Sequence, residues 1–354
     1  MTMRRRVLLA SFVLIALTAL VVPVAGAQPV ARLPMGPHDT LAAAGPQAAA
    51  IGRLWNVFLA VCVAVTLAVF AAFAYAIWHG RRADERTPPD LSGLDRHERG
   101  PYRSVIAALT VSTVLLLFLI GASVWTDRAL AQMSLVDAVH LQVTGHQWWW
   151  EVRYRGEPAS DTFTTANELH VPVGRPVVIE LRSNDVIHSL WVPNLAGKKD
   201  LIPGRTAVMH FRADRPGVYR GQCAEFCGFQ HAFMAFEVVA DPPERFAEWA
   251  ARQRQEASPP TAEEAKRGAQ VFLGSTCVMC HAIQGTSAQA TQGPDLTHVG
   301  ARRTLAAGTL ANTPEHMFRW IKDPQKLKPG THMPASNLPD ADLRAVAAYL
   351  DGLK

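Results

Sequence analysis

The amino-acid sequence predicts a multi-domain membrane protein, in which two transmembrane helices precede an all-β sandwich and then an all-α domain. Three observations predict this order. Two uncharged apolar runs of membrane-spanning length, 54–78 and 105–125, lie in the first half of the chain. Short runs that alternate with period two, broken by turn residues, fill 137–240. Helical patterning surrounds a pair of cysteines in 261–354.

The composition agrees with a chain that lies partly in lipid. Of its 354 residues 49% are hydrophobic and 18% charged, below the roughly one quarter that is usual for soluble domains. A net charge of +5 admits a nucleic acid, a membrane surface or an acidic partner. Residues 1–136 carry 12 basic and 7 acidic residues, so the whole excess of +5 lies there. We therefore interpret the charge as a topology signal and expect no nucleic-acid partner.

The N-terminus has the features of a secretory signal peptide. Three arginines, Arg4–Arg6, precede an apolar run over 7–22, and Ala25-Gly26-Ala27 offers small residues for cleavage. We predict cleavage after Ala27, which removes residues 1–27. A retained membrane helix is the alternative, but 16 apolar residues are short for a span.

Residues 28–136 are predicted to form a two-helix transmembrane hairpin. Its spans, 54–78 and 105–125, are flanked by tryptophan and tyrosine, which prefer the headgroup layer. The loop between the spans carries six arginines, so the positive-inside bias makes it cytoplasmic and places everything after residue 126 outside. Cys62 lies within the first span, and we assign it no role.

Residues 137–240 are predicted to form an antiparallel β-sandwich or barrel. Val177, Ile179 and Leu181 alternate with Val178 and Glu180, which is the period of a half-buried strand. Proline and glycine recur between such runs throughout the region. Several short strands with regular turn signals are typical of an all-β domain of this size.

One segment of this region concentrates metal-binding side chains. Cys223, Cys227, His231 and Met234 fall within twelve residues, and His188 lies earlier in the same region. Sulfur together with imidazole selects copper, zinc or an iron–sulfur cluster. A disulfide needs no histidine and methionine at set spacing, and structural zinc makes little use of methionine. Two thiolates can bridge two metals, so a dinuclear copper centre is the interpretation that we favour.

The segment closely resembles the copper-binding loop of cytochrome c oxidase subunit II, which forms the dinuclear CuA centre on a cupredoxin-like Greek-key sandwich. The resemblance also covers Gly145–Trp150, Asp185–Ser189 and Asp200–Arg205, and it runs from about residue 30 to 240. By matching positions it implies six copper ligands: Cys223 and Cys227 as bridges, His188 and His231 with one copper each, and Met234 and the Glu225 backbone carbonyl as weak ligands.

The same resemblance implies roles outside the copper ligand set. The Glu225 carboxylate matches a position that binds magnesium at the contact with subunit I. Trp148 matches the aromatic residue through which electrons enter in relatives without a fused cytochrome. Relatives often carry a glutamate followed by a tryptophan before the second span, associated with proton uptake. Here that stretch holds Glu98 without the tryptophan, and we expect Glu98 to be a solvated loop charge.

Residues 241–260 are predicted to be a linker. Pro242-Pro243 ends the last strand, 244–256 can form a short polar helix, and Ser258-Pro259-Pro260 ends that helix. We interpret the segment as a semi-rigid tether that keeps the following domain near the copper site.

The last domain carries the c-type haem attachment motif, Cys277-Val-Met-Cys280-His281. Two thioether links need two thiols that are one short loop apart, and the adjacent histidine supplies an iron ligand. A thioredoxin-like Cys-x-x-Cys motif lacks the following histidine and needs a βαβ context. We therefore expect one covalently bound haem c, attached at Cys277 and Cys280, with His281 as an axial ligand.

Residues 261–354 resemble a class I cytochrome c. Gly293–Leu296 resembles the loop in which the Pro294 carbonyl accepts a hydrogen bond from the axial histidine, and Gly330–Pro334 resembles the distal-ligand loop. The resemblance makes Met333 the sixth ligand, with His332 as the alternative. We expect first and last helices over 262–273 and 340–350, in contact through Gly268, Phe272 and Tyr349.

The combined motifs predict subunit II of a proton-pumping haem–copper oxidase with a fused C-terminal cytochrome c domain, in a bacterial inner membrane and with both redox domains periplasmic. Electrons would pass from a soluble or membrane cytochrome c, or an upstream cytochrome complex, to the haem, to the copper pair and on to subunit I, where O₂ is reduced to water. Subunit III and membrane lipid are further expected partners. No residue of this chain is expected to act as a catalytic acid or base.

Two other functions remain open at this point. One is the electron-accepting subunit of a CuA-containing nitric oxide reductase, which the genes of neighbouring subunits would distinguish. The other is a copper-binding assembly or storage protein, which would have no use for a haem.

Overall fold

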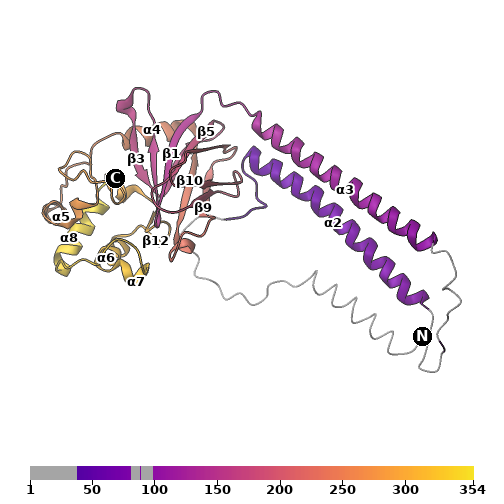
Figure 1. Cartoon of the computed structure of the whole chain (residues 1–354). Coiled ribbons are helices and arrows are strands. Elements are labelled where there is room, and N and C mark those ends of the chain that lie inside the picture. The colour runs from indigo at the N-terminus through magenta and orange to yellow at the C-terminus, as the bar shows by residue number, and fades with distance from the viewer. Residues whose placement is uncertain (1–37, 81–87, 89–98) are drawn as a thin grey trace. The chain divides into compact units, whose positions relative to one another are not determined.

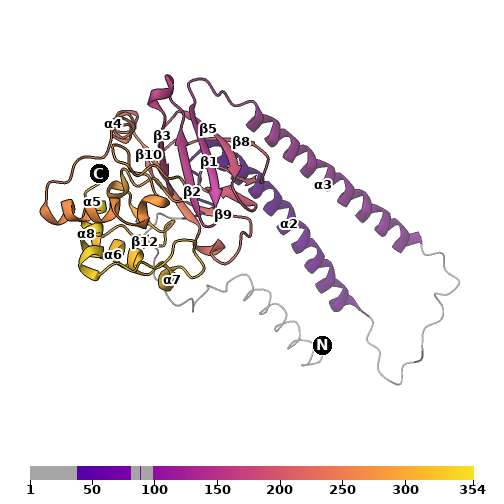
Figure 2. The ribbon, with the colours of Figure 1, turned by 60° about the vertical axis from the view of Figure 1, so that its left-hand side comes forward.

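The computed structural model describes residues 38–80, 88 and 99–354. The predicted signal peptide, residues 1–27, and Glu98 lie outside the described residues. Figures 1 and 2 show the described elements in two orientations.

Two long helices open the described chain. Helix α2 (Pro46–His79) and helix α3 (Arg99–Ala131) have mean hydropathies of 2.8 and 2.6 in their most apolar windows, and both are long enough to cross a membrane. Most of their large apolar side chains are exposed, as expected for surfaces that meet lipid or another subunit. The first turn of α2 is different, because Gln47 and Ala48 are buried and bond to backbone carbonyls of the following domain.

Two five-stranded sheets form a sandwich after the helices (Figure 1). One sheet has the order β3-β2-β1-β5-β8 and the other has the order β4-β10-β9-β6-β7. The strands of the first sheet are β1 (Val139–His146), β2 (Trp149–Tyr154), β3 (Phe163–Ala166), β5 (Pro176–Ser183) and β8 (Ala207–Arg212). Those of the second are β4 (Glu168–Pro172), β6 (His188–Trp191), β7 (Lys198–Leu201), β9 (Gly217–Cys223) and β10 (Ala235–Asp241).

The sandwich core follows the period of two in the sequence. In β5, Val177, Ile179 and Leu181 are fully buried, while the residues between them are only partly buried. The predicted sandwich is confirmed, but the expectation that its strands are antiparallel was wrong for two pairs, because β1 pairs with β5 and β4 pairs with β10 in parallel. Turn signals report only on strands that are neighbours in sequence, whereas both parallel pairs join strands that are far apart in the chain.

The predicted linker begins with helix α4 (Pro243–Gln253), which packs on the sandwich. The ring of Trp249 stacks on that of His170 at a centroid distance of 4.2 Å, and Ala250 belongs to the sandwich core. This part of the segment is therefore fixed to the preceding domain.

The C-terminal domain is mainly helical. Its elements are α5 (Glu263–Leu273), the 3₁₀ turns η3 (Thr276–Met279) and η4 (Val299–Ala301), the short hairpin of β11 (Thr304–Leu305) and β12 (Leu310–Ala311), and the helices α6 (Pro314–Lys322), α7 (Pro324–Leu327) and α8 (Asp340–Asp351). Helices α5 and α8 meet at Gly268, where an added Cβ would lie 1.9 Å from the Ala345 carbonyl oxygen. Phe272 and Tyr349 are buried at the same contact, which confirms the predicted pairing of the first and last helices.

Candidate metal and cofactor sites

The second sheet and one loop bring the predicted copper ligands together. Cys223 is the last residue of β9 and His188 is the first of β6, and these two strands pair antiparallel. The loop after β9 turns back through the 3₁₀ turn η2 (His231–Phe233). The Cys223 amide then donates to the Met234 carbonyl oxygen over 2.9 Å, which closes the loop over the end of the strand.

All six predicted ligands converge on one small volume. The Sγ atoms of Cys223 and Cys227 lie 3.8 Å apart, and both thiols are free. Four other donors surround them: His188 Nδ1 at 3.9 Å and the Glu225 carbonyl oxygen at 3.3 Å from Cys223 Sγ, and His231 Nδ1 at 3.6 Å and Met234 Sδ at 3.8 Å from Cys227 Sγ. Two sulfurs, two imidazoles, a thioether and a carbonyl suit copper by their chemistry.

A hydrogen bond couples the two thiols of this site. The hydrogen bond between them lowers the pKa of Cys223 and raises the pKa of Cys227, because the thiolate of one is stabilised by the S–H of the other. Both cysteines are buried, and so is Met234, whose side chain is fully enclosed. A soft cation fits this buried pair, because it would neutralise the charge of two adjacent thiolates.

Asp185 holds His188 in place. Its Oδ1 lies 2.7 Å from His188 Nε2, while the backbone amides of Gln147 and Val186 donate to the same carboxylate. Burial lowers the pKa of His188, but the hydrogen bonds with Asp185 and Cys223 outweigh it and raise the pKa overall. A carboxylate on one ring nitrogen directs the other nitrogen to the metal. Asp185 belongs to a motif that carried the resemblance, but the sequence assigned it no role of its own.

The side chains of Trp148 and Glu225 differ in their exposure. Trp148 is 5% exposed, and its Nε1 donates to the Cys227 carbonyl oxygen over 2.9 Å. The Glu225 side chain is exposed, so the predicted magnesium site at a contact with another subunit stays a prediction.

The haem attachment motif lies in η3 and the residues that follow it. Cys277 is the second residue of this tight turn, and the His281 amide donates to the Cys277 carbonyl oxygen over 3.1 Å. His281 Nδ1 lies 2.7 Å from the Pro294 carbonyl oxygen, which leaves Nε2 as the ring atom available to a metal. Burial lowers the pKa of His281 and favours the neutral ring that a ligand needs. An added Cβ at Gly293 would lie 2.7 Å from the His281 ring, so only glycine fits there.

The predicted distal loop is ordered by Gln325. Its Nε2 donates to the carbonyl oxygens of Thr331 and Met333 over 2.7 and 3.0 Å. Met333 is partly buried, whereas His332 is exposed and its ring lies 5.6 Å from that of Trp148. Met333 as the sixth ligand, with His332 as the alternative, stays a prediction.

Arg302 is a functional candidate that sequence reasoning missed. It is partly buried in the C-terminal domain, its Nε is inaccessible to solvent, and desolvation lowers its pKa. Its Nη2 donates to the Asp295 carbonyl oxygen, but its Nε has no partner within the described residues. A buried cation with an unpaired donor close to His281 suits an anionic group, and haem propionates are such groups. In the sequence, the pair Arg302-Arg303 is a weak indication of an anion-binding site.

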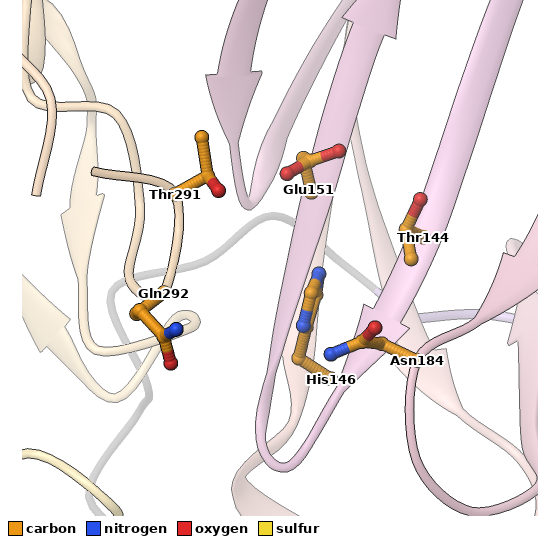
Figure 3. A pocket seen from close by; sticks show the side chains of 6 residues that line it. All are labelled: Thr144, His146, Glu151, Asn184, Thr291 and Gln292. Atoms are coloured by element: carbon orange, nitrogen blue, oxygen red, sulfur yellow. The ribbon is translucent and has the colours of Figure 1, made fainter. Parts of the chain in front are cut away.

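A cavity of about 330 Å³ lies between the sandwich and the C-terminal domain (Figure 3). Thr144, His146, Glu151 and Asn184 line one side, and Thr291 and Gln292 line the other. Burial lowers the pKa of His146 to about 4, so the ring is neutral at pH 7. It stacks on Trp149 at a centroid distance of 4.3 Å. The cavity is polar, and we assign no ligand to it.

Comparison with known proteins gives matches to both domains. A family model described as the periplasmic domain of cytochrome c oxidase subunit II matches residues 159–241, and a model described as cytochrome c matches residues 265–354. The chain is 36% identical to cytochrome c oxidase subunit 2 of Alkalihalophilus pseudofirmus over 319 residues, which cover 88% of this chain and 89% of the relative. It is 31% identical to that of Bacillus subtilis, over 62% of this chain and 63% of the relative.

Among solved structures, the chain is similar to the periplasmic domain of subunit II of cytochrome oxidase from Bradyrhizobium japonicum. The identity is 30%, the match covers 34% of this chain and 97% of the other, and the TM-score is 0.32. The assignment rests instead on the match to the Alkalihalophilus protein, which extends over nearly the full length of both chains. The two apolar helices, the sandwich with its clustered sulfur and imidazole donors, and the helical domain follow one another in the order expected for such a relative. The chain therefore belongs to the cytochrome c oxidase subunit II family and carries a C-terminal cytochrome c domain.

Proposed function

We propose that this chain receives electrons at a covalent haem c, passes them to a dinuclear copper centre and delivers them to subunit I of a proton-pumping cytochrome c oxidase, where O₂ is reduced to water. Family membership makes the chain a subunit of an oxidoreductase and supports a role in electron transfer. The observation that carries the finer proposal is the convergence of six donors, two of which are thiol sulfur atoms 3.8 Å apart.

The copper centre would be held by the residues that cluster at the end of β9. Cys223 and Cys227 would bridge two copper ions, His188 and His231 would bind one each, and Met234 and the Glu225 carbonyl oxygen would complete the set. The pair would supply a one-electron couple within a rigid site. Asp185 orients His188, and burial of the thiols would exclude water from a bound metal.

The haem would be held by the cytochrome domain. Cys277 and Cys280 would form the thioether links, and His281 and Met333 would be the axial ligands. Methionine as a partner of histidine raises the haem potential, as a carrier near a copper oxidase requires. The Pro294 carbonyl oxygen orients His281, and Arg302 would meet the propionates. The unpaired Arg302 Nε and the absence of a side chain at Gly293 fit this group.

The proposal extends to topology and partners. Helices α2 and α3 would anchor the chain in a bacterial inner membrane after removal of residues 1–27, with residues 137–240 and 261–354 as separate periplasmic redox domains. Subunit I would bind beside the copper site, with magnesium at Glu225, and subunit III would complete the complex. A cytochrome c or an upstream cytochrome complex would be the donor.

The test is the spectroscopy of the purified, loaded full-length chain. We expect c-type haem absorbance that survives denaturation and an EPR spectrum of one electron shared by two copper ions. A single-copper hyperfine pattern would contradict the dinuclear assignment. Haem that is lost on denaturation would contradict the attachment at Cys277 and Cys280. Oxygen consumption by the whole complex, compared with nitric oxide consumption, would separate the oxidase from a related reductase.

A further inference from the structure

The cytochrome domain contacts the copper-binding domain in two places. The first, which we call the junction, joins the segment Lys328–His332 to Trp148 and to the loop residues Phe229 and Gln230. The second, the hairpin contact, joins the β11–β12 hairpin and Arg303 to strands β4 and β10. Both consist of directed hydrogen bonds as well as packing.

Lys328 lies at the centre of the junction. Its side chain is almost fully buried, and its Nζ donates to the carbonyl oxygen of Trp148 over 2.8 Å and to that of Ala306 over 3.2 Å. A buried ammonium is unfavourable unless its protons find acceptors. The Trp148 carbonyl oxygen belongs to the copper-binding domain and that of Ala306 to the cytochrome domain, so the bond to Trp148 forms only when the domains are in contact.

The rest of the junction joins the predicted distal-ligand loop, Gly330–Pro334, to the copper loop, by which we mean the loop 224–234 between β9 and β10. Gln230 Nε2 donates to the Pro329 carbonyl oxygen over 2.5 Å, and the His332 ring lies 5.6 Å from the ring of Trp148. His332 is bonded to Met333, and Trp148 donates to the carbonyl oxygen of Cys227. The proposed iron ligand and a proposed copper ligand are thus joined through His332 and Trp148.

The hairpin contact shows that the docking is specified by the backbone. Ala306 and Ala307 have φ angles of 52° and 56°, a left-handed conformation that alanine rarely adopts. Their carbonyl oxygens accept from Lys328 Nζ and from the Ala235 amide, the latter over 3.1 Å. Arg303 adds a backbone bond to Glu168 Oε2 at 2.9 Å and an ion pair with Glu237 at 3.0 Å. Such backbone strain persists where the surrounding contacts enforce it.

We propose that Lys328 is the positioning residue that holds the cytochrome domain against the copper-binding domain at Trp148. One electron would leave the haem and one would arrive at the copper pair, and no atom would change place. The electron-transfer part rests on the proposed function, whereas the docking part does not.

The docking is tested in the full-length, loaded chain with Lys328→Gln. The matched control is Lys326→Gln, because Lys326 lies two residues away with a side chain that is 84% exposed. Hydrogen exchange at the amides of Arg303 and Ala235 reports the contact, since both donate across it. Hydroxyl-radical labelling of Trp148 reports how far its side chain is exposed to solvent, and the fully buried Trp150 is the internal reference.

We expect exchange at both amides and labelling of Trp148 to rise by about tenfold or more in Lys328→Gln, and to stay unchanged at Trp150 and in Lys326→Gln. Unchanged exchange and labelling in a folded Lys328→Gln chain would overturn the docking role. If that variant does not fold, Arg303→Gln removes one side-chain contact with Glu237 and is expected to raise the rate of hydrogen exchange at the Ala235 amide. An unchanged exchange rate at that amide would equally overturn the proposal.

The positioning role is tested by the rate at which the copper pair is reduced after rapid photoreduction of the haem. We expect a fall of roughly tenfold or more in Lys328→Gln, with the absorbance of both centres unchanged, and no fall in Lys326→Gln. An unchanged rate despite greater labelling of Trp148 would overturn the positioning role. A wild-type chain that binds no copper or haem would refute the proposed function instead, while the labelling would still decide the docking.

Discussion

The indole Nε1 of Trp148 donates a hydrogen bond of 2.9 Å to the carbonyl oxygen of Cys227. The same carbonyl oxygen accepts a second bond, of 2.8 Å, from the side chain of Gln147. Trp148 is therefore attached directly to a residue that we propose as a bridging copper ligand, and its own carbonyl oxygen is held by Lys328. It thus bonds to the copper loop on one side and to the cytochrome domain on the other.

Replacing Trp148 with phenylalanine tests this attachment. The ring is retained and the donor is lost, while Gln147 still satisfies the Cys227 carbonyl oxygen. We expect reduction of the copper pair to slow on the order of tenfold, equivalent to roughly 1.4 kcal/mol or one hydrogen bond. Flash-photolysis absorbance of the copper band measures the rate. An unchanged rate would show that the bond has no part in electron transfer.

Cys227→Ala tests the copper ligand set. Cys227 Sγ contacts Cys223, His231 and Met234, so its removal takes away the atom that joins most of the ligands. We expect bound copper to fall from about two ions per chain and the dinuclear EPR signal to disappear. Cys62→Ala is the control, because this thiol lies in helix α2 away from the cluster. Full copper content in Cys227→Ala would contradict the proposed bridge.

Gly293→Ala tests the proximal side of the haem site. The added Cβ would lie 2.7 Å from His281 Cε1, closer than real contacts allow, so the ring must move from the Pro294 carbonyl oxygen. We expect a changed Soret band and a lower midpoint potential. Gly100→Ala, where an added Cβ meets no atom within 4 Å, is the control. Equal spectra in the two variants would show that His281 is not held as we describe.

Arg302→Gln tests the buried cation. A positive charge near the haem favours the reduced form, which carries one positive charge less, so its removal lowers the midpoint potential. We expect a fall on the order of 60 mV, a tenfold change in the one-electron equilibrium. Redox titration of the haem band measures it. Arg319→Gln, on the exposed face of α6, is the control. An equal midpoint potential in both variants would show that Arg302 does not act on the haem.

His170 makes the stability of the sandwich depend on pH. Burial lowers its pKa, but the hydrogen bonds to Asp241 at 2.7 Å and Glu168 at 3.0 Å outweigh this and raise the pKa. The Tyr154 hydroxyl donates to the His170 carbonyl oxygen and accepts from the His170 amide, so it does not contact the His170 ring nitrogens. A raised folded pKa means that the stabilisation is complete below the unfolded value near 6.5 and is lost as the pH rises through the folded pKa.

We therefore expect His170→Gln to destabilise the sandwich by roughly 2 kcal/mol at pH 5.5 and by less at pH 9. Thermal unfolding of wild type and variant across this range measures the difference. His140→Gln, at an exposed position on β1, should show little effect at either pH. A difference that grows with pH would reverse the sign and contradict the charged pair.

Much of the fold follows from local patterns. Uncharged apolar runs predicted the two long helices, the alternation in β5 predicted its buried face, and Gly268 predicted where α5 and α8 meet. The two parallel strand pairs did not follow, because pairing of distant strands leaves no signal in either strand. The packing of α4 through Trp249 also depends on a partner, His170, that lies far away in sequence.

By itself the sequence determined which side chains could hold copper and haem, since thiols and imidazoles at fixed short spacing restrict the chemistry whatever the fold. The tertiary structure decided what surrounds them: that Asp185 orients His188, that the Nε of Arg302 is buried without a partner among the described residues, and that Lys328 bonds to Trp148. These relationships depend on burial and on contacts between distant segments. The free energy of a buried charge is set by the acceptors that surround it in space, and no spacing along the chain encodes them.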